Sequence, residues 1–253
     1  MLPLSGVTVV VTRPAHQAEN LCQQIEAAGG KVIRFPVLDI SPQQDSQKCQ
    51  AQLAQLAEID LAIFVSANAV NAAFAMQPHW PPHLSIAAVG KATAQALAKH
   101  QQADILIAPE PFNSEALLRL PELQKMDGKR VMILRGEGGR EFLRDRLLER
   151  GAEVEYVECY QRKMPDTDTT QLYAAWQQEQ TMPIIVTSNQ SLQNLYAMIN
   201  QDHRPALLGS PLILLSERTA SLANELGFTQ APVVATAAND DAMLSALTRW
   251  AQS

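Results

Sequence analysis

The chain has 253 residues, enough for two domains of ordinary size, each with its own core. Apolar residues make up 47% and charged residues 18%, a balance typical of a folded globular protein. The net charge is −6, no cluster of Lys and Arg stands out, and no apolar run approaches the roughly 18 residues of a membrane span, so nucleic-acid binding and membrane insertion are poor hypotheses.

Short apolar runs alternate with longer stretches of helical period. The first run, 8–12, is rich in β-branched residues, and the stretch 17–28 after it ends at Gly29. Further apolar runs lie at 61–65, 85–89, 104–108, 131–134, 183–186, 212–215 and 233–235. Further helical stretches lie at 69–76, 93–100, 114–120, 141–150, 191–199, 219–226 and 241–250. Continuous apolar strands that lead into helices predict parallel sheets covered on both faces, hence an α/β fold of two doubly wound domains.

Two segments break this rhythm. Residues 32–40 and 154–163 have extended character, and no helix follows directly. Pro36, Pro42 and Pro165 lie close by, as is common at boundaries. We therefore expect these segments to connect domains.

The sequence also contains an internal repeat. At an offset of 122 positions, and of 126 after a length difference in one loop, polar and glycine residues at the ends of predicted strands match. Matched pairs are Arg13 and Arg135, Gly29 and Gly151, Ser66 and Ser188, and Thr93 and Thr219. Two facing sets of such loops would form a cleft, where we expect the function. The repeat alone would divide the chain near 125–129, whereas the connectors suggest another division, and the residues leave both open.

Six loops join a predicted strand to a predicted helix: 12–14, 66–68, 90–93, 135–139, 187–189 and 216–219. In a doubly wound sheet they all lie at the carboxyl ends of strands, where such folds bind ligands. Each opens a helix whose first N–H groups are unpaired and carry partial positive charge. Each Ser, Thr or Asn could serve only as a helix cap. Six loops repeated in pairs favour a shared site for a polyanion.

Other classes of site have little support. The glycines of 136–139 lack the full dinucleotide fingerprint, and no P-loop or nucleophile elbow occurs. His79 and His83 flank Trp-Pro-Pro, which cannot be a regular helix, so we expect no metal. Three scattered cysteines and an N-terminus without a basic leader indicate a cytoplasmic protein with reduced thiols.

Tyr160 lies in the second extended segment, beside the expected cleft. Two interpretations stay open: its ring packs at a hinge between domains, or its hydroxyl acts in the chemistry. A phenol is protonated at neutral pH, so it can donate a proton to a leaving hydroxyl.

Six motifs occur in a definite order: Val-Thr-Arg-Pro at 11–14, Phe-Val-Ser at 64–66, Ala-Val-Gly at 88–90, Ile-Leu-Arg-Gly at 133–136, Glu-Cys-Tyr-Gln-Arg at 158–162 and Val-Thr-Ser at 186–188. In order and spacing, over nearly the whole chain, they resemble the uroporphyrinogen-III synthase family of tetrapyrrole biosynthesis. Ala67 and Asn189 depart from it, since a proline is common at these places.

The resemblance implies interleaved domains of flavodoxin-like type. One domain would combine 1–35 with 166–253, and the other would span 41–157. Residues 36–40 and 158–165 would form a two-stranded connector.

The resemblance also implies the reaction: hydroxymethylbilane closes to uroporphyrinogen III, with loss of water and inversion of ring D, in the cleft between the domains. No metal or cofactor is required. Tyr160 is implied as the proton donor. Contacts to the eight substrate carboxylates are implied for Arg13, Ser66, Gly90, Thr93, Arg135, Gly136, Ser188 and Thr219. We further expect a monomer that makes transient contact with hydroxymethylbilane synthase.

Two rivals from other classes remain. A two-domain solute-binding or sensor protein also uses duplicated α/β lobes, but it predicts an export signal or a fused effector domain, and the sequence shows neither. An NAD- or flavin-binding enzyme is the third hypothesis, and a purified protein without cofactor absorbance would disfavour flavin.

Overall fold

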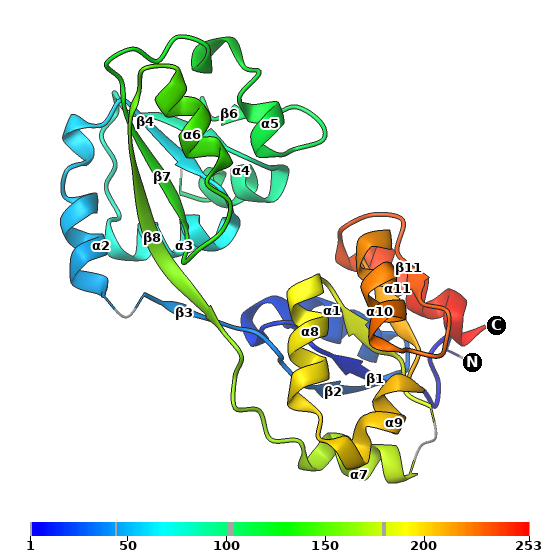
Figure 1. Ribbon diagram of the computed structural model, residues 1–253. Helices are drawn as coiled ribbons and strands as arrows, with labels where there is room; N and C mark the ends of the chain where they lie inside the picture. The colour runs from blue at the N-terminus through cyan, green and yellow to red at the C-terminus, as the bar shows by residue number, and fades with distance from the viewer. Residues whose placement is uncertain (1, 44, 101–103, 179–180, 253) are drawn as a thin grey trace. The chain divides into compact units, whose positions relative to one another are not determined.

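The computed structural model describes residues 2–43, 45–100, 104–178 and 181–252. The chain forms two compact units, coloured by residue number in Figure 1. Unit 1 comprises residues 1–39 and 163–253, and unit 2 comprises residues 40–162. Within the described ranges, no helix combines the length and apolar character needed to cross a membrane.

Unit 1 is a parallel sheet of order β11-β10-β9-β1-β2, with helices on both faces. Its strands are β1 (Thr8–Val11), β2 (Lys31–Arg34), β9 (Ile184–Val186), β10 (Leu212–Leu214) and β11 (Val233–Val234). Its helices are α1 (Ala15–Ala27), α7 (Thr170–Gln178), α8 (Asn189–Met198), α9 (Arg204–Leu208), α10 (Glu217–Leu226) and α11 (Asp240–Ala251). Alternation along β1 sends Val10 to the core under α8 and α10, and Val9 and Val11 to the core under α1 and α11.

Unit 2 has a sheet of order β3-β8-β7-β4-β5-β6, in which the pairs from β8 to β6 are parallel. Its strands are β3 (Asp39–Pro42), β4 (Leu61–Phe64), β5 (Ser85–Ala88), β6 (Leu106–Ile107), β7 (Arg130–Gly136) and β8 (Glu153–Lys163). Its helices are α2 (Ser46–Leu53), α3 (Ala67–Met76), α4 (Lys91–Ala98), α5 (Ser114–Leu117) and α6 (Phe142–Glu149). Helices α2, α3 and α4 cover one core cluster, and α5 and α6 cover the other.

The two units have the same strand topology, but the chain begins with a different strand of that topology in each unit. The order β2-β1-β9-β10-β11 of unit 1 corresponds to β8-β7-β4-β5-β6 of unit 2. The 122-residue offset matches β1 with β7 and β4 with β9, and the 126-residue offset matches β5 with β10. Unit 2 is therefore a circular permutation of unit 1, which explains how a tandem repeat produces interleaved units. The predicted fold class is confirmed: parallel sheets covered on both faces, in the strand order of flavodoxin-like domains.

The two predicted connectors, 32–40 and 154–163, also contribute strands to the sheets. Lys31–Arg34 pairs with β1 along its whole length, and β8 pairs with β7 as far as Tyr160. Three helices that the sequence analysis did not predict are α2, α7 and α9. Helix α2 is rich in Gln and buries only Cys49 and Leu53, so its apolar period is weak.

Candidate active site

A β-bulge near the end of β8 sets the direction of Tyr160. Arg135 of β7 pairs with Glu158, but the next residue, Gly136, pairs with Tyr160, so β8 carries one extra residue, Cys159. Strict alternation would place Tyr160 on the same face as Glu158. Because of the bulge, Tyr160 instead joins Cys159 in the core cluster under α2, α3 and α4.

Gly136 makes room for this tyrosine. The Tyr160 side chain is only 1% exposed. A Cβ atom on Gly136 would lie 2.6 Å from Cζ of Tyr160, closer than real Cβ atoms approach, and 3.0 Å from its hydroxyl oxygen. The backbone N–H of Glu137 donates a 2.8 Å hydrogen bond to the Tyr160 carbonyl and fixes this close approach. Glycine is therefore the one residue type that fits at position 136.

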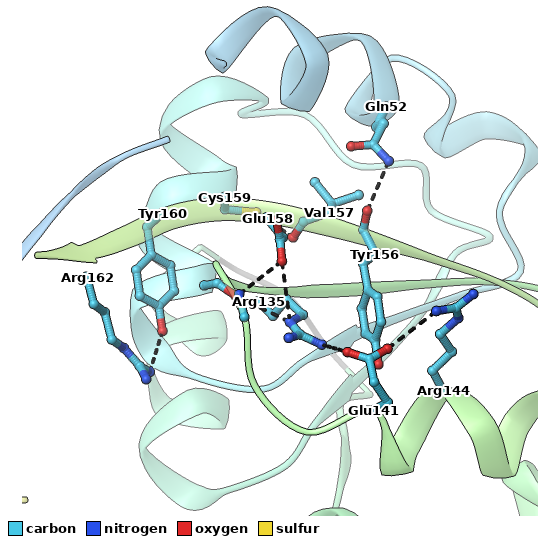
Figure 2. A network of polar contacts seen from close by, with 12 residues as sticks. Gln52, Arg135, Glu141, Arg144, Tyr156, Val157, Glu158, Cys159, Tyr160 and Arg162 are labelled. Atoms are coloured by element: carbon cyan, nitrogen blue, oxygen red, sulfur yellow. Dashed lines mark hydrogen bonds and ion pairs between the residues drawn. The ribbon is translucent and has the colours of Figure 1, made fainter. Parts of the chain in front are cut away.

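The Tyr160 hydroxyl lies between an arginine and a serine. Nη2 of Arg162 donates a 2.9 Å hydrogen bond to the phenol oxygen, as Figure 2 shows. Ser66 Oγ lies 3.1 Å from the same oxygen and also accepts the Ala69 N–H at 3.2 Å, which caps α3. Arginine can only donate, so the phenol oxygen is the acceptor in the first contact. The phenol proton is left for Ser66 or for a ligand.

A pocket of about 190 Å³ in unit 2 opens beside this hydroxyl. Its polar side chains are Ser66, Ser114, Arg135, Arg140, Tyr156, Tyr160 and Arg162. Three of the described lining residues are arginines, and none is acidic. The lining therefore favours an anion, in keeping with the polyanion site that the loops predict.

Arg135 holds in place the loop 136–141, which lies beside the pocket. Its side chain is 6% exposed, its Nη1 donates to Oε1 of Glu141 at 3.2 Å, and its Nε lies 3.9 Å from Oε1 of Glu158. Its guanidinium stacks 4.2 Å from the ring centre of Tyr156. Glu158 also accepts the Gly138 N–H at 3.1 Å. Figure 2 shows Arg135 between the two carboxylates. This arginine is thus neutralised by protein groups and orders the loop 136–141.

The same network affects two pKa values. Burial would raise the pKa of Glu141, but hydrogen bonds from Arg135 and Arg144 outweigh it, and the pKa lies below its ordinary value. Burial, followed by the nearby Glu141 carboxylate, raises the pKa of Tyr156 above that of an ordinary phenol. Tyr156 is therefore a weaker proton donor than a phenol in water.

Two predicted residues of unit 2 lie outside the pocket lining. Gly90 is the N-cap of α4, and a Cβ atom there would meet no atom within 4 Å. Thr93 is buried in the first turn of α4, and its hydroxyl forms no hydrogen bond with another described residue. Of the predicted set, the pocket brings together Ser66, Arg135, Gly136 and Tyr160.

The predicted residues of unit 1 all have protein partners. Arg13 forms an ion pair with Asp240, the first residue of α11. Ser188 caps α8, and Thr219 Oγ1 donates to Asn189 Oδ1 at 2.8 Å. Ser66 and Ser188 are thus both N-caps.

The sequence analysis did not assign four polar residues of the pocket: Ser114, Arg140, Tyr156 and Arg162. A signal existed for Arg162. It follows Tyr160 by two positions in an extended segment, and such residues share a face of a strand. Ser114 is the first residue of α5 and Arg140 lies in the loop before α6, and only the fold reveals that the two approach the same pocket.

The chain is similar to known proteins over most of its length. The family model of uroporphyrinogen-III synthase HemD matches residues 19–245. Uroporphyrinogen-III synthase of Escherichia coli K12 is 41% identical, with 95% of this chain and all of that protein covered. The synthase of Synechococcus elongatus is 31% identical, with 99% and 97% covered.

Two solved structures share the fold. Mutant uroporphyrinogen III synthase from Thermus thermophilus matches with a TM-score of 0.63 at 18% identity, over 98% of this chain and 99% of that one. The synthetase from Helicobacter pylori 26695 gives the same score and identity, over 96% and 99%. At this identity the likeness concerns the fold, whereas the family model and the sequence relatives concern descent. The chain belongs to the uroporphyrinogen-III synthase family.

Proposed function

We propose that the chain catalyses the closure of hydroxymethylbilane to uroporphyrinogen III, with loss of water and inversion of ring D, in tetrapyrrole biosynthesis. Family membership supports the reaction. The observation that ties it to a site is the buried Tyr160 hydroxyl, held by Arg162 and Ser66 beside an arginine-lined pocket. This arrangement combines a proton donor with groups that attract a polycarboxylate.

Tyr160 would act in the first step. The phenol proton transfers to the hydroxymethyl oxygen on ring A, the C–O bond breaks, and water leaves. The bilane keeps the positive charge as an azafulvenium cation, and Tyr160 becomes a phenolate. The guanidinium of Arg162, 2.9 Å from that oxygen, stabilises the new negative charge.

Ring D would then attack through its substituted carbon. The resulting spiro intermediate fragments, and ring D closes again through its other α-carbon. Loss of the proton from that carbon restores the pyrrole, and the phenolate of Tyr160 can take it back. Protons balance over the cycle, so the net change is the loss of one water.

Selection of geometry is the larger task, because the bilane closes unaided to isomer I. We assign substrate carboxylate contacts to Ser66, Gly90, Thr93, Arg135 and Gly136 of unit 2 and to Ser188 and Thr219 of unit 1. Arg13 can join them only if a substrate carboxylate displaces that of Asp240.

An unstable substrate also favours direct transfer from its producer. We therefore propose a transient contact between a monomer of this chain and hydroxymethylbilane synthase in the cytoplasm. Sedimentation of the two proteins together, with and without substrate, tests this contact. Independent sedimentation in both cases would contradict it.

Incubation with freshly made hydroxymethylbilane tests the function. The products are oxidised, and the porphyrin isomers I and III are separated. We expect isomer III to predominate. Isomer I alone, formed at the rate of the reaction without protein, would refute the proposed function.

A further inference from the structure

The pocket beside Tyr160 has a counterpart in unit 1. A second, smaller pocket is lined by Arg13, Leu21, Thr187, Leu215, Ala238, Asn239, Asp240 and Met243. The 122-residue offset relates Arg13 to Arg135, Leu21 to Leu143 and Thr187 to Val65, and all three partners line the pocket of unit 2. Because the two units share one topology, these are the same pocket in two copies.

The two copies differ in size and, among other lining residues, at the first residue of the matched helices α5 and α11. The pocket of unit 2 measures about 190 Å³, and that of unit 1 about 30 Å³. The 126-residue offset relates Ser114 to Asp240. Each follows an N-cap asparagine, Asn113 or Asn239, whose side chain accepts the N–H three residues later. The aspartate is therefore the serine's structural equivalent.

Asp240 places a carboxylate in the unit-1 pocket. Its Oδ1 pairs with Nη1 of Arg13, and its Oδ2 accepts a 2.7 Å hydrogen bond from Asn20. The side chains of Arg13 and Asp240 are 22% and 21% exposed, so water screens the pair only in part. Unit 1 thus shows the pocket filled, with an arginine and a carboxylate of the protein in contact.

The serine of unit 2 leaves this space open and its cations less fully neutralised. Arg140 pairs with Glu115, and Arg135 with two glutamates. Arg162, in contrast, has no carboxylate partner among the described residues, and the phenol oxygen of Tyr160 takes one of its five donors. A guanidinium with free donors beside hydroxyl groups is suited to a carboxylate.

We propose that the unit-2 pocket is a subsite for one carboxylate-bearing side chain of the substrate, bound by Arg162, and that Asp240 closes the equivalent subsite in unit 1. The inference rests on the proposed function for the identity of the substrate. The subsite would anchor the bilane next to the Tyr160 hydroxyl, and Arg13 would then have a structural role rather than a contact with substrate.

Ser114→Asp tests the subsite by copying the unit-1 residue into unit 2. Asp240 shows that this helix position accepts an aspartate, and a negative charge in the first turn of a helix is favourable, so the variant should fold. The new carboxylate should pair with Arg135, the counterpart of Arg13, and repel the substrate carboxylate from the pocket. We expect KM for hydroxymethylbilane to rise about 10- to 100-fold, as for loss of one charge-assisted hydrogen bond, with kcat changed much less.

Two variants are controls. Ser114→Asn has the size of the aspartate without its charge and should raise KM far less. Ser245→Asp adds one negative charge on an exposed face of α11 and should leave KM unchanged. Thermal melts of all three variants separate loss of folding from loss of binding.

Binding of uroporphyrin III, a stable octacarboxylate, gives a readout besides turnover. Its fluorescence titration should show the same order of affinity: wild type, then Ser114→Asn, then Ser114→Asp. Equal KM values and equal affinities for the aspartate and asparagine variants would overturn the subsite inference. The proposed function would still stand if the wild type formed isomer III. A wild-type protein that forms no isomer III but loses uroporphyrin binding in Ser114→Asp would refute the function alone.

Discussion

At the scale of single residues, the site depends on a close approach between two strands. Tyr160 reaches its position because Cys159 is an extra residue in β8 and because Gly136 has no side chain. Its hydroxyl then finds Arg162 and Ser66, one a pure donor and the other already engaged in a helix cap. Small changes at position 136 should therefore affect chemistry through Tyr160.

Gly136→Ala should displace the Tyr160 ring, since the added Cβ would lie 2.6 Å from its Cζ. Overpacking of this kind costs about 1–3 kcal/mol of stability, so the variant should fold with a lower Tm. We expect its kcat/KM to fall at least as far as that of Tyr160→Phe. In a Tyr160→Phe background, Gly136→Ala should reduce activity little further. Additive losses would mean that Gly136 acts on another part of the site.

At the scale of elements, one residue, Asp60, joins three strands of the unit-2 sheet at their amino-terminal ends. Asp60, just before β4, accepts a 2.8 Å hydrogen bond from Lys129 Nζ and a 2.9 Å hydrogen bond from the Arg130 N–H at the start of β7. Its carbonyl accepts the Ser85 N–H at the start of β5. These bonds set the register of three parallel strands whose other ends carry the site.

Asp60→Asn should therefore destabilise the protein in a pH-dependent way. The hydrogen bond from Lys129, followed by that from the Arg130 N–H, lowers the pKa of Asp60 in the folded state. Stability from this group is therefore present above the unfolded pKa, about 3.9, and is lost as pH falls through the folded value. The Lys129 pair is half-exposed, so we expect a decrease in Tm of only about 1–4 °C at pH 7.

Thermal melting curves of Asp60→Asn and wild type at several pH values measure this pH-dependent loss of stability. The difference between Asp60→Asn and wild type should narrow below about pH 4 and disappear once Asp60 is protonated in both states. Asp166→Asn, at an exposed carboxylate outside the sheet, is the control and should leave Tm unchanged. A difference that is the same at pH 3 and pH 7 would show that the carboxylate charge is not its source.

At the scale of the whole molecule, one topology is used twice with different entry points. Unit 1 begins with its first two strands, and the chain returns to it with the third strand after unit 2, whereas unit 2 begins with its third strand and ends with its first two. A cut in the middle of the sequence repeat consequently falls inside unit 2. Fragments can therefore distinguish the repeat from the structural units.

The fragment 41–157 should fold alone, because it keeps β4, β5, β6, β7 and the part of β8 that pairs with residues 130–134, with their helices. The fragment 1–127 lacks β7 and leaves the buried strand β4 with an open edge, so it should aggregate or bind a hydrophobic dye. Thermal melts of both fragments provide the measurement. Cooperative melting of 1–127 together with an unfolded 41–157 would mean that the domains are sequential.

The sequence predicted the order of elements and the fold class, because buried parallel strands leave continuous apolar runs. It missed α2, where polar residues outnumber the two buried ones, and it could not show the bulge, since adjacent Cys159 and Tyr160 carry no sign of an unpaired position. The motif that contains Tyr160 was found, whereas the role of Ser114 required the pocket. The local sequence pattern thus predicts helices and strands, whereas the site depends on close contacts between these elements.

In the proposed mechanism, the Tyr160 hydroxyl donates the proton that releases water. The rates at which wild type and Tyr160→Phe form isomer III, measured with the same preparation of hydroxymethylbilane, test it most directly. Phenylalanine keeps the buried ring and loses only the contacts to Arg162 and Ser66. A positioned acid contributes about 10²–10⁴-fold, and a water can replace this one in part, so we predict a fall in kcat/KM of about 100-fold with isomer III still formed. An unchanged kcat/KM in a folded Tyr160→Phe variant would contradict the claim and leave Tyr160 as a packing residue.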